Sequence, residues 1–328
     1  MFKIVYVLTS KVGDYYYEQL MISLESLRNK MPQIDVVVVT DDLTYATLTG
    51  DRHQVFDFAT VKKVEIDNRF NQKERSRYLK TSLRSIIQGD FLFIDCDTVI
   101  CCDFSEHKIE SVLAMSLDRN CKLSEWADEG KEIRRTAQRC NFDLRECDNY
   151  YNSGVMWVKE CELTKRFFEE WHKYWEETLK IGMCVDQLSL NHVNTNIFPL
   201  IEELDGTWNC QVTLKPAGVE YIANSKIIHY FNTNPESPYM LCDESMIREG
   251  VNDQEVKKII SEPRSAFRKS YIVTMNSRLD NFMKTKQFKV LFKFYNKFSG
   301  LFELNEKILN LIQTILFGIK RNKNWERY

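Results

Sequence analysis

Short apolar runs alternate with amphipathic segments along most of the chain. The runs 3–10 (KIVYVLTS), 34–42 (IDVVVVTDD) and 91–94 (FLFI) are rich in β-branched or aromatic residues, which is typical of strands buried on both faces of a parallel sheet. Segments 15–30 and 74–88 separate these runs and carry apolar residues at helical spacing. The pattern therefore predicts an α/β fold with a mostly parallel sheet flanked by helices.

The same alternation continues beyond residue 110. SVLAMSLD (111–118) and YYNSGVMWV (150–158) are predicted strands, and 162–180 is a predicted amphipathic helix. The polar stretch 119–149 between the two strands is predicted to be an excursion over the surface. No internal repeat is apparent. A length of 328 residues predicts one large domain or two smaller ones.

Polar residues follow several of the predicted strands. Asp95 and Asp97 come directly after FLFI, and in extended chain their carboxylates face one side, where they repel each other unless a cation, a proton or a set of donors neutralises them. A D-x-D pair by itself favours an ordinary turn with solvated aspartates. Ligands of open α/β sheets collect at the carboxyl ends of strands, so these aspartates are predicted to share one rim with other polar strand ends. Those strand ends are Thr9, Asp41, Asp42 and Asp118. Such a rim favours a cation or a polyhydroxylated ligand, although helix N-caps would use the same residues.

Composition narrows the class of protein. With 44% hydrophobic and 28% charged residues, the 328-residue chain is typical of a folded globular protein. Its ten cysteines include no C-x-x-C pair, and MFKIVYVLTS is not typical of a signal peptide, so we expect free thiols in the cytoplasm. The sequence contains no uninterrupted run of 18 apolar residues, so no membrane-spanning helix is predicted.

Charge is distributed unevenly along the chain. Residues 264–328 hold 14 basic and 4 acidic residues, whereas residues 1–263 hold 31 basic and 43 acidic ones. This predicts an acidic body, 1–263, and a basic, helical tail, 264–328. Lysines alternate with aromatic residues in the tail, which favours contact with an anionic membrane surface, or else packing on the acidic body. No recognised nucleic-acid module accompanies the tail, so we expect no nucleic acid partner.

Five stretches, taken in order, resemble the retaining glycosyltransferases of family 8, which have the metal-dependent GT-A fold. They are the first strand and helix with its tyrosine cluster and SLESL, then FLFIDCDTVI, YYNSGVMWVK, DQLSLN (186–191) and IIHYF (227–231). The resemblance spans residues 1 to about 231. It implies a hexosyltransferase that moves a hexose from a UDP-sugar to a glycan or glycolipid acceptor with retention of anomeric configuration, as in bacterial surface-polysaccharide or lipooligosaccharide synthesis and in glycogenin-like enzymes.

The resemblance also implies a metal site. It assigns Mn²⁺ or Mg²⁺ to Asp95, Asp97 and His229, with Asp97 the firmer ligand and Asp95 contacting the ribose as well. Two carboxylates and an imidazole suit a first-row divalent ion. By the same resemblance, Arg77 and Lys80 supply positive charge toward the nucleotide, although both residues would also fit a solvated helix face. The family has a glycine and then a lysine after its metal histidine. Here Asn232 replaces the glycine and no lysine follows nearby, so the residues that bind the diphosphate are expected to differ from those of the family.

The resemblance assigns the remaining donor-binding residues. Thr9 and Tyr16 match residues that contact uracil and ribose, although Tyr15 or Tyr17 could replace Tyr16, and Asp41 could accept from the base or ribose or begin a turn. Asp118 joins this donor-binding set.

The sugar itself is assigned to Asn152 and Asp186, and Gly154 leaves room for close approach of the backbone. Gln187 matches the family residue opposite the leaving group. Because an amide is a poor nucleophile, front-face attack is favoured over a double displacement. Asp186 is the only carboxylate in the motif that could act as a nucleophile instead. Trp208 and Asn209 resemble a stretch that lines the acceptor side.

Two other functions remain open at this point. A sugar-phosphate nucleotidyltransferase would share the fold, but its Gly-rich, basic N-terminal loop is missing from VLTSKVGDYYYEQ. A non-catalytic sugar-binding relative would be expected to lose the metal ligands, whereas Asp95, Asp97 and His229 are all present. The leading hypothesis is a cytoplasmic glycosyltransferase that contacts the inner face of the cell membrane through its tail.

Overall fold

The computed structural model describes residues 2–126, 128–212, 219–231, 241, 244–268, 286–298, 300–301, 304, 307–308 and 311. The chain divides into two compact units, Met1–Tyr271 and Ile272–Tyr328. The boundary predicted between 263 and 264 lies close to this division and stays a prediction. The cysteines among the described residues form no disulfide with one another.

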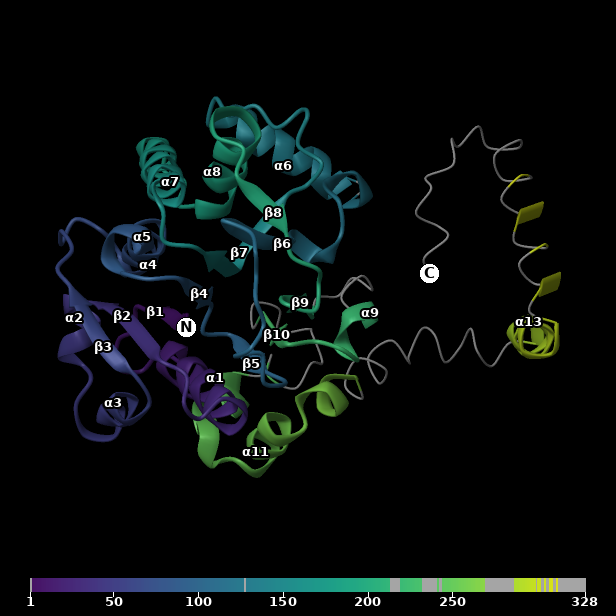
Figure 1. Cartoon of the computed structure of the whole chain (residues 1–328), viewed down its shortest axis with the longest axis horizontal. Helices are drawn as coiled ribbons and strands as arrows, with labels where there is room; N and C mark the ends of the chain where they lie inside the picture. Colours follow the sequence, from purple (N-terminus) through teal and green to yellow (C-terminus); the bar gives the residue numbers. More distant parts are fainter. Residues whose placement is uncertain are drawn as a thin grey trace. The chain divides into compact units, whose positions relative to one another are not determined.

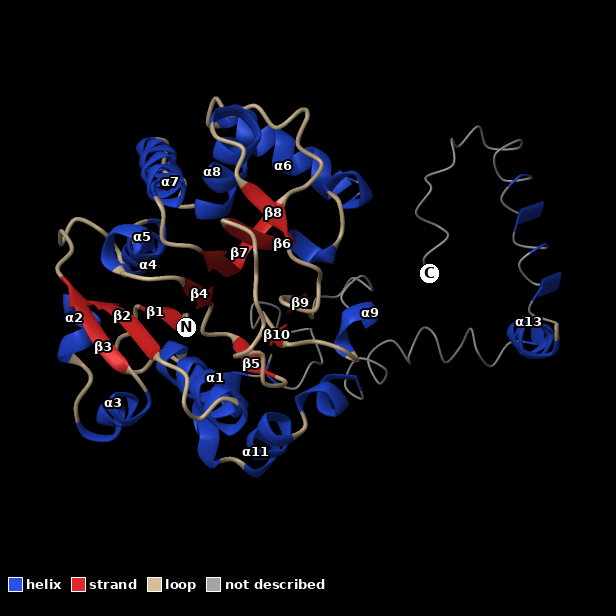
Figure 2. Ribbon diagram, viewed as in Figure 1, coloured by secondary structure: helices blue, strands red, loops and turns tan. Residues whose placement is uncertain are grey.

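A seven-stranded sheet forms the centre of the first unit, with strand order β3-β2-β1-β4-β7-β6-β8 (Figures 1 and 2). Strands β3, β2, β1 and β4 are parallel, β7 is antiparallel to both of its neighbours, and β8 is parallel to β6. The carboxyl ends of β1, β2, β4 and β6 therefore share one edge with the amino end of β7. The prediction of a mostly parallel α/β sheet is confirmed. The strands are β1 (Lys3–Leu8), β2 (Val36–Asp41), β3 (Thr60–Val64), β4 (Phe91–Ile94), β6 (Leu113–Leu117), β7 (Tyr151–Val158) and β8 (Ile201–Glu203).

Helices cover both faces of this sheet (Figure 1). The helix predicted over 74–88 is two helices, α4 and α5, which meet at Ser82, and α7 begins and ends at the predicted residues. The stretch 119–149, predicted as a surface excursion, contains a helix, α6. The described helices of the first unit include α1 (Tyr16–Lys30), α2 (Asp42–Ala46), α3 (Val55–Phe58), α4 (Gln72–Thr81), α5 (Leu83–Ile86), α6 (Asp128–Arg139), α7 (Glu162–Lys180), α8 (Asp186–His192), α9 (Val219–Ile222), α10 (Glu244–Glu249) and α11 (Gln254–Ser261).

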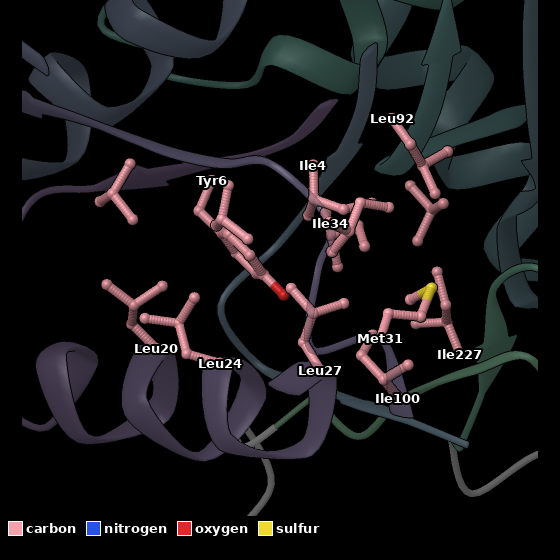
Figure 3. Packing of buried hydrophobic residues seen from close by; sticks show 14 of the residues in the cluster. Ile4, Tyr6, Leu20, Leu24, Leu27, Met31, Ile34, Leu92, Ile100 and Ile227 are labelled. Atoms are coloured by element: carbon pink, nitrogen blue, oxygen red, sulfur yellow. The ribbon is translucent and has the colours of Figure 1, made fainter. Parts of the chain in front are cut away.

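The core lies on both sides of the sheet because successive strand residues point to opposite faces. Ile4 and Tyr6 of β1 belong to the same buried cluster as Leu20 and Leu24 of α1, and Figure 3 shows Tyr6 pointing from its strand toward the helix. The residues that alternate with these along the central strands, including Phe93 of β4, pack on the other face of the sheet with α4, α5 and α7. Each fully buried side chain of this size contributes about 1.5–3 kcal/mol.

A second sheet of three strands lies beside the end of β4. It has the order β5-β10-β9, with β5 (Thr98–Ile100) antiparallel to β10 (Ile227–His229) and β9 (Cys210–Gln211) parallel to it. His229 pairs with Thr98, and the backbone N–H of Tyr230 donates to the carbonyl of Asp97 at 3.1 Å. This small sheet thus brings two segments that are far apart in the sequence to one place.

The second unit contains the helix α13 (Lys286–Lys297). Its described apolar side chains include several with large exposed fractions: Val290, Leu291, Phe298, Leu301, Leu304, Ile308 and Leu311. Residues 269–285 of the predicted tail lie outside the described residues, as does Asn232. Among the described residues, no helix has the length and apolar character needed to cross a membrane.

Candidate active site

Three side chains with metal-binding atoms converge at the sheet edge. Asp95 and Asp97 follow β4, His229 ends β10, and one ligand atom from each lies within 4.8 Å of the others. The Nε2 atom of His229 is 3.1 Å from Oδ1 of Asp97. The structure therefore brings together the three residues that the sequence predicts as metal ligands. Their donor set, two carboxylates and one imidazole, fits a first-row divalent cation.

The two aspartates have different electrostatic surroundings. Burial raises the pKa of Asp95, and the charge of Asp97 raises it further, while the ammonium of Lys80 opposes both. That ammonium lies 2.9 Å from Oδ1 of Asp95. Burial also works against ionisation of Asp97, but the His229 imidazole outweighs it and lowers the pKa of Asp97. The repulsion expected from the sequence is thus offset on one side by Lys80 and on the other by His229.

Helix α4 supplies the cations of this region. Its start is fixed by a capping box, in which Asn71 accepts from the Glu74 N–H at 3.0 Å and Glu74 accepts from the Asn71 N–H at 2.8 Å. Arg77 and Lys80 lie one turn apart on the same helix face. Lys80 is only 3% exposed, so the alternative of a solvated helix face is wrong for this residue.

Asp186, the first residue of α8, pairs with both cations. Its Oδ1 lies 2.8 Å from Nε of Arg77, and its Oδ2 lies 3.9 Å from Nζ of Lys80. Ser153 donates to the same Oδ2 at 3.0 Å. Burial opposes ionisation, but the charges of Arg77 and Lys80 outweigh it and lower the pKa of Asp186. This carboxylate is therefore held as an anion between positive groups.

Asp118, Asn152 and Gln187 form a hydrogen-bonded group at the same edge. Asn152, near the amino end of the antiparallel β7, donates to Oδ1 of Asp118 at 2.8 Å and to Oε1 of Gln187 at 3.3 Å. Gln187 donates to Oδ2 of Asp118 at 2.9 Å. Burial raises the pKa of Asp118, and these two amide donors oppose the rise. The structure thus brings Gln187, predicted as catalytic, into contact with Asp118 and Asn152, which are predicted to bind the donor.

The proposed uracil-binding residues have mixed surroundings. Thr9 follows β1 and donates to the Gln72 carbonyl at 3.3 Å. Tyr17 is buried in the core, whereas the side chain of Tyr16, the first residue of α1, is 43% exposed, so Tyr16 is the more accessible of the two. Asp41 is 2% exposed. It caps α2 by accepting from the Thr44 N–H at 3.0 Å and is ion-paired with Arg75.

Two residues have contacts that the sequence did not predict. Asn209, expected on the acceptor side, is fully buried and lies between Asn152 and His229 because β9 pairs with β10. Gly154 was expected to leave room for a ligand, but that room is taken by His229: a Cβ at residue 154 would lie 2.4 Å from Cε1 of the imidazole. Both contacts join segments distant in sequence, so no local pattern could indicate them.

Comparison with solved structures supports the fold. The chain is similar to the apo structure of the bifunctional glycosyltransferase WbbM, with a TM-score of 0.51 and 15% identity over 78% of this chain. This chain covers 51% of WbbM, about half of its length. No protein-family model and no curated protein sequence matches the chain.

Two further likenesses are weaker. The galactosyltransferase LgtC, solved with donor and acceptor sugar analogs, has a TM-score of 0.48 and 14% identity over 79% of this chain and 95% of its own. The glycosyltransferase GlyE of Streptococcus pneumoniae TIGR4 has a TM-score of 0.48 and 16% identity over 81% of this chain and 65% of its own. At these identities the likeness shows the fold alone, which is the α/β GT-A fold predicted from the sequence.

Proposed function

We propose that this chain is a metal-dependent hexosyltransferase that uses a UDP-sugar donor and a glycan or glycolipid acceptor, with retention of anomeric configuration. The observation that carries the proposal is the convergence of Asp95, Asp97 and His229 at the edge of a GT-A sheet. A fold hosts many activities, and the activity is argued from the site. Beside this cluster lie cations suited to a diphosphate and a group of amides and carboxylates suited to a sugar.

Asp95, Asp97 and His229 would hold Mn²⁺ or Mg²⁺, which when bound neutralises the charge that develops on a departing diphosphate. Arg77 and Lys80 add positive charge at the same place, because both lie on the α4 face that meets Asp95 and Asp186. They take the role that the missing lysine after His229 plays in the family that the sequence resembles. The exposed Tyr16 ring is suited to stack on uracil, with Thr9 near the base and ribose. Asp41 is held by Arg75 and by the Thr44 N–H, so it is not part of this set.

Asn152, Asp118, Asp186 and Gln187 offer donors and acceptors to the sugar hydroxyls. Asp186 is paired with Arg77 and accepts from Ser153, which makes it a weak nucleophile, and the Gln187 amide is a poor one. Both facts favour front-face attack. In that reaction the bond from the anomeric carbon to the diphosphate oxygen breaks, the bond to the acceptor oxygen forms on the same face, and the acceptor's hydroxyl proton passes to the leaving diphosphate.

The most direct test follows slow donor hydrolysis over a panel of UDP-sugars with Mn²⁺. One donor should be hydrolysed to UDP and free sugar, and the reaction should stop with EDTA or with Asp97→Ala. Asp103→Ala is the matched control, since Asp103 is exposed and, within the described part of the chain, accepts hydrogen bonds only from Ser105. Hydrolysis that ignores EDTA and Asp97→Ala defeats the proposal. Formation of sugar 1-phosphate on adding pyrophosphate would identify a nucleotidyltransferase instead, and metal-dependent binding without any turnover would identify a non-catalytic relative.

We also propose that the basic tail contacts an anionic membrane on the cytoplasmic side, where a lipid-linked acceptor would lie. Supporting this, exposed Leu291 and Phe298 lie close in sequence to the exposed Lys293 and Lys297. Each basic residue near such a surface contributes about 1 kcal/mol. Replacing both lysines by glutamate should reduce sedimentation with phosphatidylglycerol vesicles and leave the low binding to phosphatidylcholine vesicles unchanged. Equal sedimentation of variant and wild type with anionic vesicles rejects the contact.

A further inference from the structure

The turn that follows β6 has an uncommon backbone conformation. Arg119 and Asn120 have φ values of 57° and 54°, and among the described residues no other two consecutive non-glycine residues have positive φ. Side chains other than glycine avoid this left-handed region, so the turn costs free energy and needs contacts that hold it. Asp118, whose carboxylate meets Asn152 and Gln187, immediately precedes the pair. The turn therefore determines where one residue of the proposed sugar site lies.

The side chain of Gln211, the last residue of β9, holds this turn. Its Oε1 accepts from the Arg119 N–H at 2.7 Å, and its Nε2 donates to the Leu117 carbonyl at 2.8 Å. A backbone N–H can only donate and a carbonyl can only accept, so both contacts give the amide the same orientation. Gln211 has no exposed surface, and water does not compete for these bonds. One buried amide therefore bonds the residues on both sides of Asp118.

Asn120 makes the same kind of connection in the opposite direction. Its Oδ1 accepts from the Gln211 N–H at 2.8 Å, and its Nδ2 donates to the Asn209 carbonyl at 2.9 Å. Here too the two backbone partners agree on one orientation of the amide. Asparagine tolerates positive φ better than most residues because its short side chain can bond nearby backbone groups. Together, the four bonds of Gln211 and Asn120 join β6 of the large sheet to β9 of the small sheet.

We infer that Gln211 is a positioning residue that holds the Asp118 carboxylate toward the donor sugar. It also fixes this carboxylate relative to the proposed metal site, because Gln211 pairs with His229 in the β9–β10 register and the next N–H, that of Val212, donates to the His229 carbonyl at 2.9 Å. Groups that contact a substrate must be held to within about 0.5 Å by the residues behind them. The inference rests on the proposed function for its purpose, whereas the bonds that hold the turn do not depend on it.

The test compares binding of UDP, UDP-glucose and UDP-galactose by the full chain with Mn²⁺, measured by calorimetry. Gln211→Leu removes both side-chain bonds at similar volume. It should weaken binding of the better hexose donor about 10–100-fold, the usual effect of losing a hydrogen bond to a charged group, and leave the affinity for UDP unchanged. Wild-type affinity for the hexose donor in this variant, or an equal loss for UDP, overturns the inference.

Two further variants separate positioning from general destabilisation. Ser116→Ala is the matched control, because it removes another buried hydrogen bond of β6, the 3.1 Å bond to the Asp205 carbonyl, and leaves the turn intact. Its three affinities should match the wild type. Asn120→Gly keeps the positive φ without strain and removes two of the four bonds, so it should weaken hexose donor binding in the same direction by a smaller factor. If Gln211→Leu does not fold, Asn120→Gly decides alone, and wild-type affinity there overturns the inference.

A double-mutant cycle between residues 211 and 118 needs no ligand. Gln211→Leu should cost less free energy of unfolding in an Asp118→Ala chain than in the wild type, because the contacts of the carboxylate with Asn152 and Gln187 are then already absent. Urea unfolding measures both costs, and Asn120→Gly replaces Gln211→Leu in the cycle if the latter does not fold. Equal costs overturn the positioning role. Failure of the wild type to bind any of the three nucleotides would instead reject the proposed function, while unequal costs would still support the hold of Gln211 on Asp118.

Discussion

The ends of β2 and β4 each carry two aspartates, and the two ends differ in which groups neutralise them. At the end of β2, Asp41 and Asp42 are both ion-paired with Arg75. The same guanidinium also donates to the carbonyls of Ile66 at 3.1 Å and Asp67 at 3.2 Å. Arg75 is 1% exposed, and its donors are directed at protein acceptors. We call this strand end closed, because a buried side chain of the protein itself neutralises its carboxylates.

The end of β4 also carries two aspartates, but their carboxylates remain partly accessible. Asp95 and Asp97 are half-buried, and their neutralising partners are the ammonium of Lys80 and the imidazole of His229. An ammonium is a compact point charge, whereas a guanidinium fixes carboxylates through several directed bonds. Both Arg75 and Lys80 come from α4, so one helix neutralises both strand ends. We propose that the partners at the β4 end, unlike Arg75 at the β2 end, can give way to a divalent cation.

The largest effect is expected from Arg75→Met. Removing the guanidinium leaves the buried Asp41 carboxylate without its partner, which should destabilise the fold by about 3–5 kcal/mol. Urea unfolding monitored by circular dichroism measures this loss. Adding Asp41→Asn in the same chain should recover part of it, because the uncompensated charge is gone. Saturating Mn²⁺ with UDP should not recover it, and a loss below about 1 kcal/mol would show that the β2 end is not closed by this ion pair.

Lys80→Met should have a smaller and different effect. Without Mn²⁺, the loss of the ammonium leaves Asp95 and Asp97 facing each other, at a cost of about 2 kcal/mol, since Asp95 is partly screened by solvent. Saturating Mn²⁺ with UDP should restore most of the stability, because a bound cation replaces the lost charge and stabilises the folded state. Thermal unfolding with EDTA or with Mn²⁺ and UDP compares the two conditions. An equal loss in both would mean that no exchangeable cation occupies the β4 end.

Gly154→Ala tests the room left for His229. The added Cβ would lie 2.4 Å from Cε1 of the imidazole, so the ring must shift, at a cost of at least about 1 kcal/mol. Mn²⁺ affinity should fall about tenfold or more, since the ligand nitrogen moves with the ring. Adding the same change to a His229→Ala chain should cost less than it does in the wild type. If the two costs are equal, the imidazole does not limit residue 154.

The sequence predicts the central strands well because their burial on both faces leaves continuous apolar runs. The edge strand β3, TVKKV, was missed because exposed lysines interrupt its valines, as expected of a strand with one open side. The small sheet of β5, β10 and β9 was also missed, since its strands are short and pair across long separations.

The residues of the candidate site likewise fall into those that the sequence predicts and those that it does not. Order along the chain and resemblance to a family were sufficient to select Asp95, Asp97 and His229. The roles of Arg75, Asn209 and Gly154 depend on which distant side chain each one meets in the folded chain. No periodicity or motif within a single segment carries that information.

The central claim is that the β4 end exchanges its neutralising partner for a divalent cation. It is tested most directly by titrating Mn²⁺, with free Mn²⁺ followed by electron paramagnetic resonance, into the UDP-saturated wild type, Asp97→Asn and Asp103→Asn. Wild type and Asp103→Asn should bind one ion with equal affinity. Asp97→Asn should bind it about 100-fold more weakly or worse, because loss of a direct ligand costs at least as much as loss of an outer partner, and thermal unfolding without metal should show that this variant is folded. Wild-type Mn²⁺ affinity in Asp97→Asn would contradict the account.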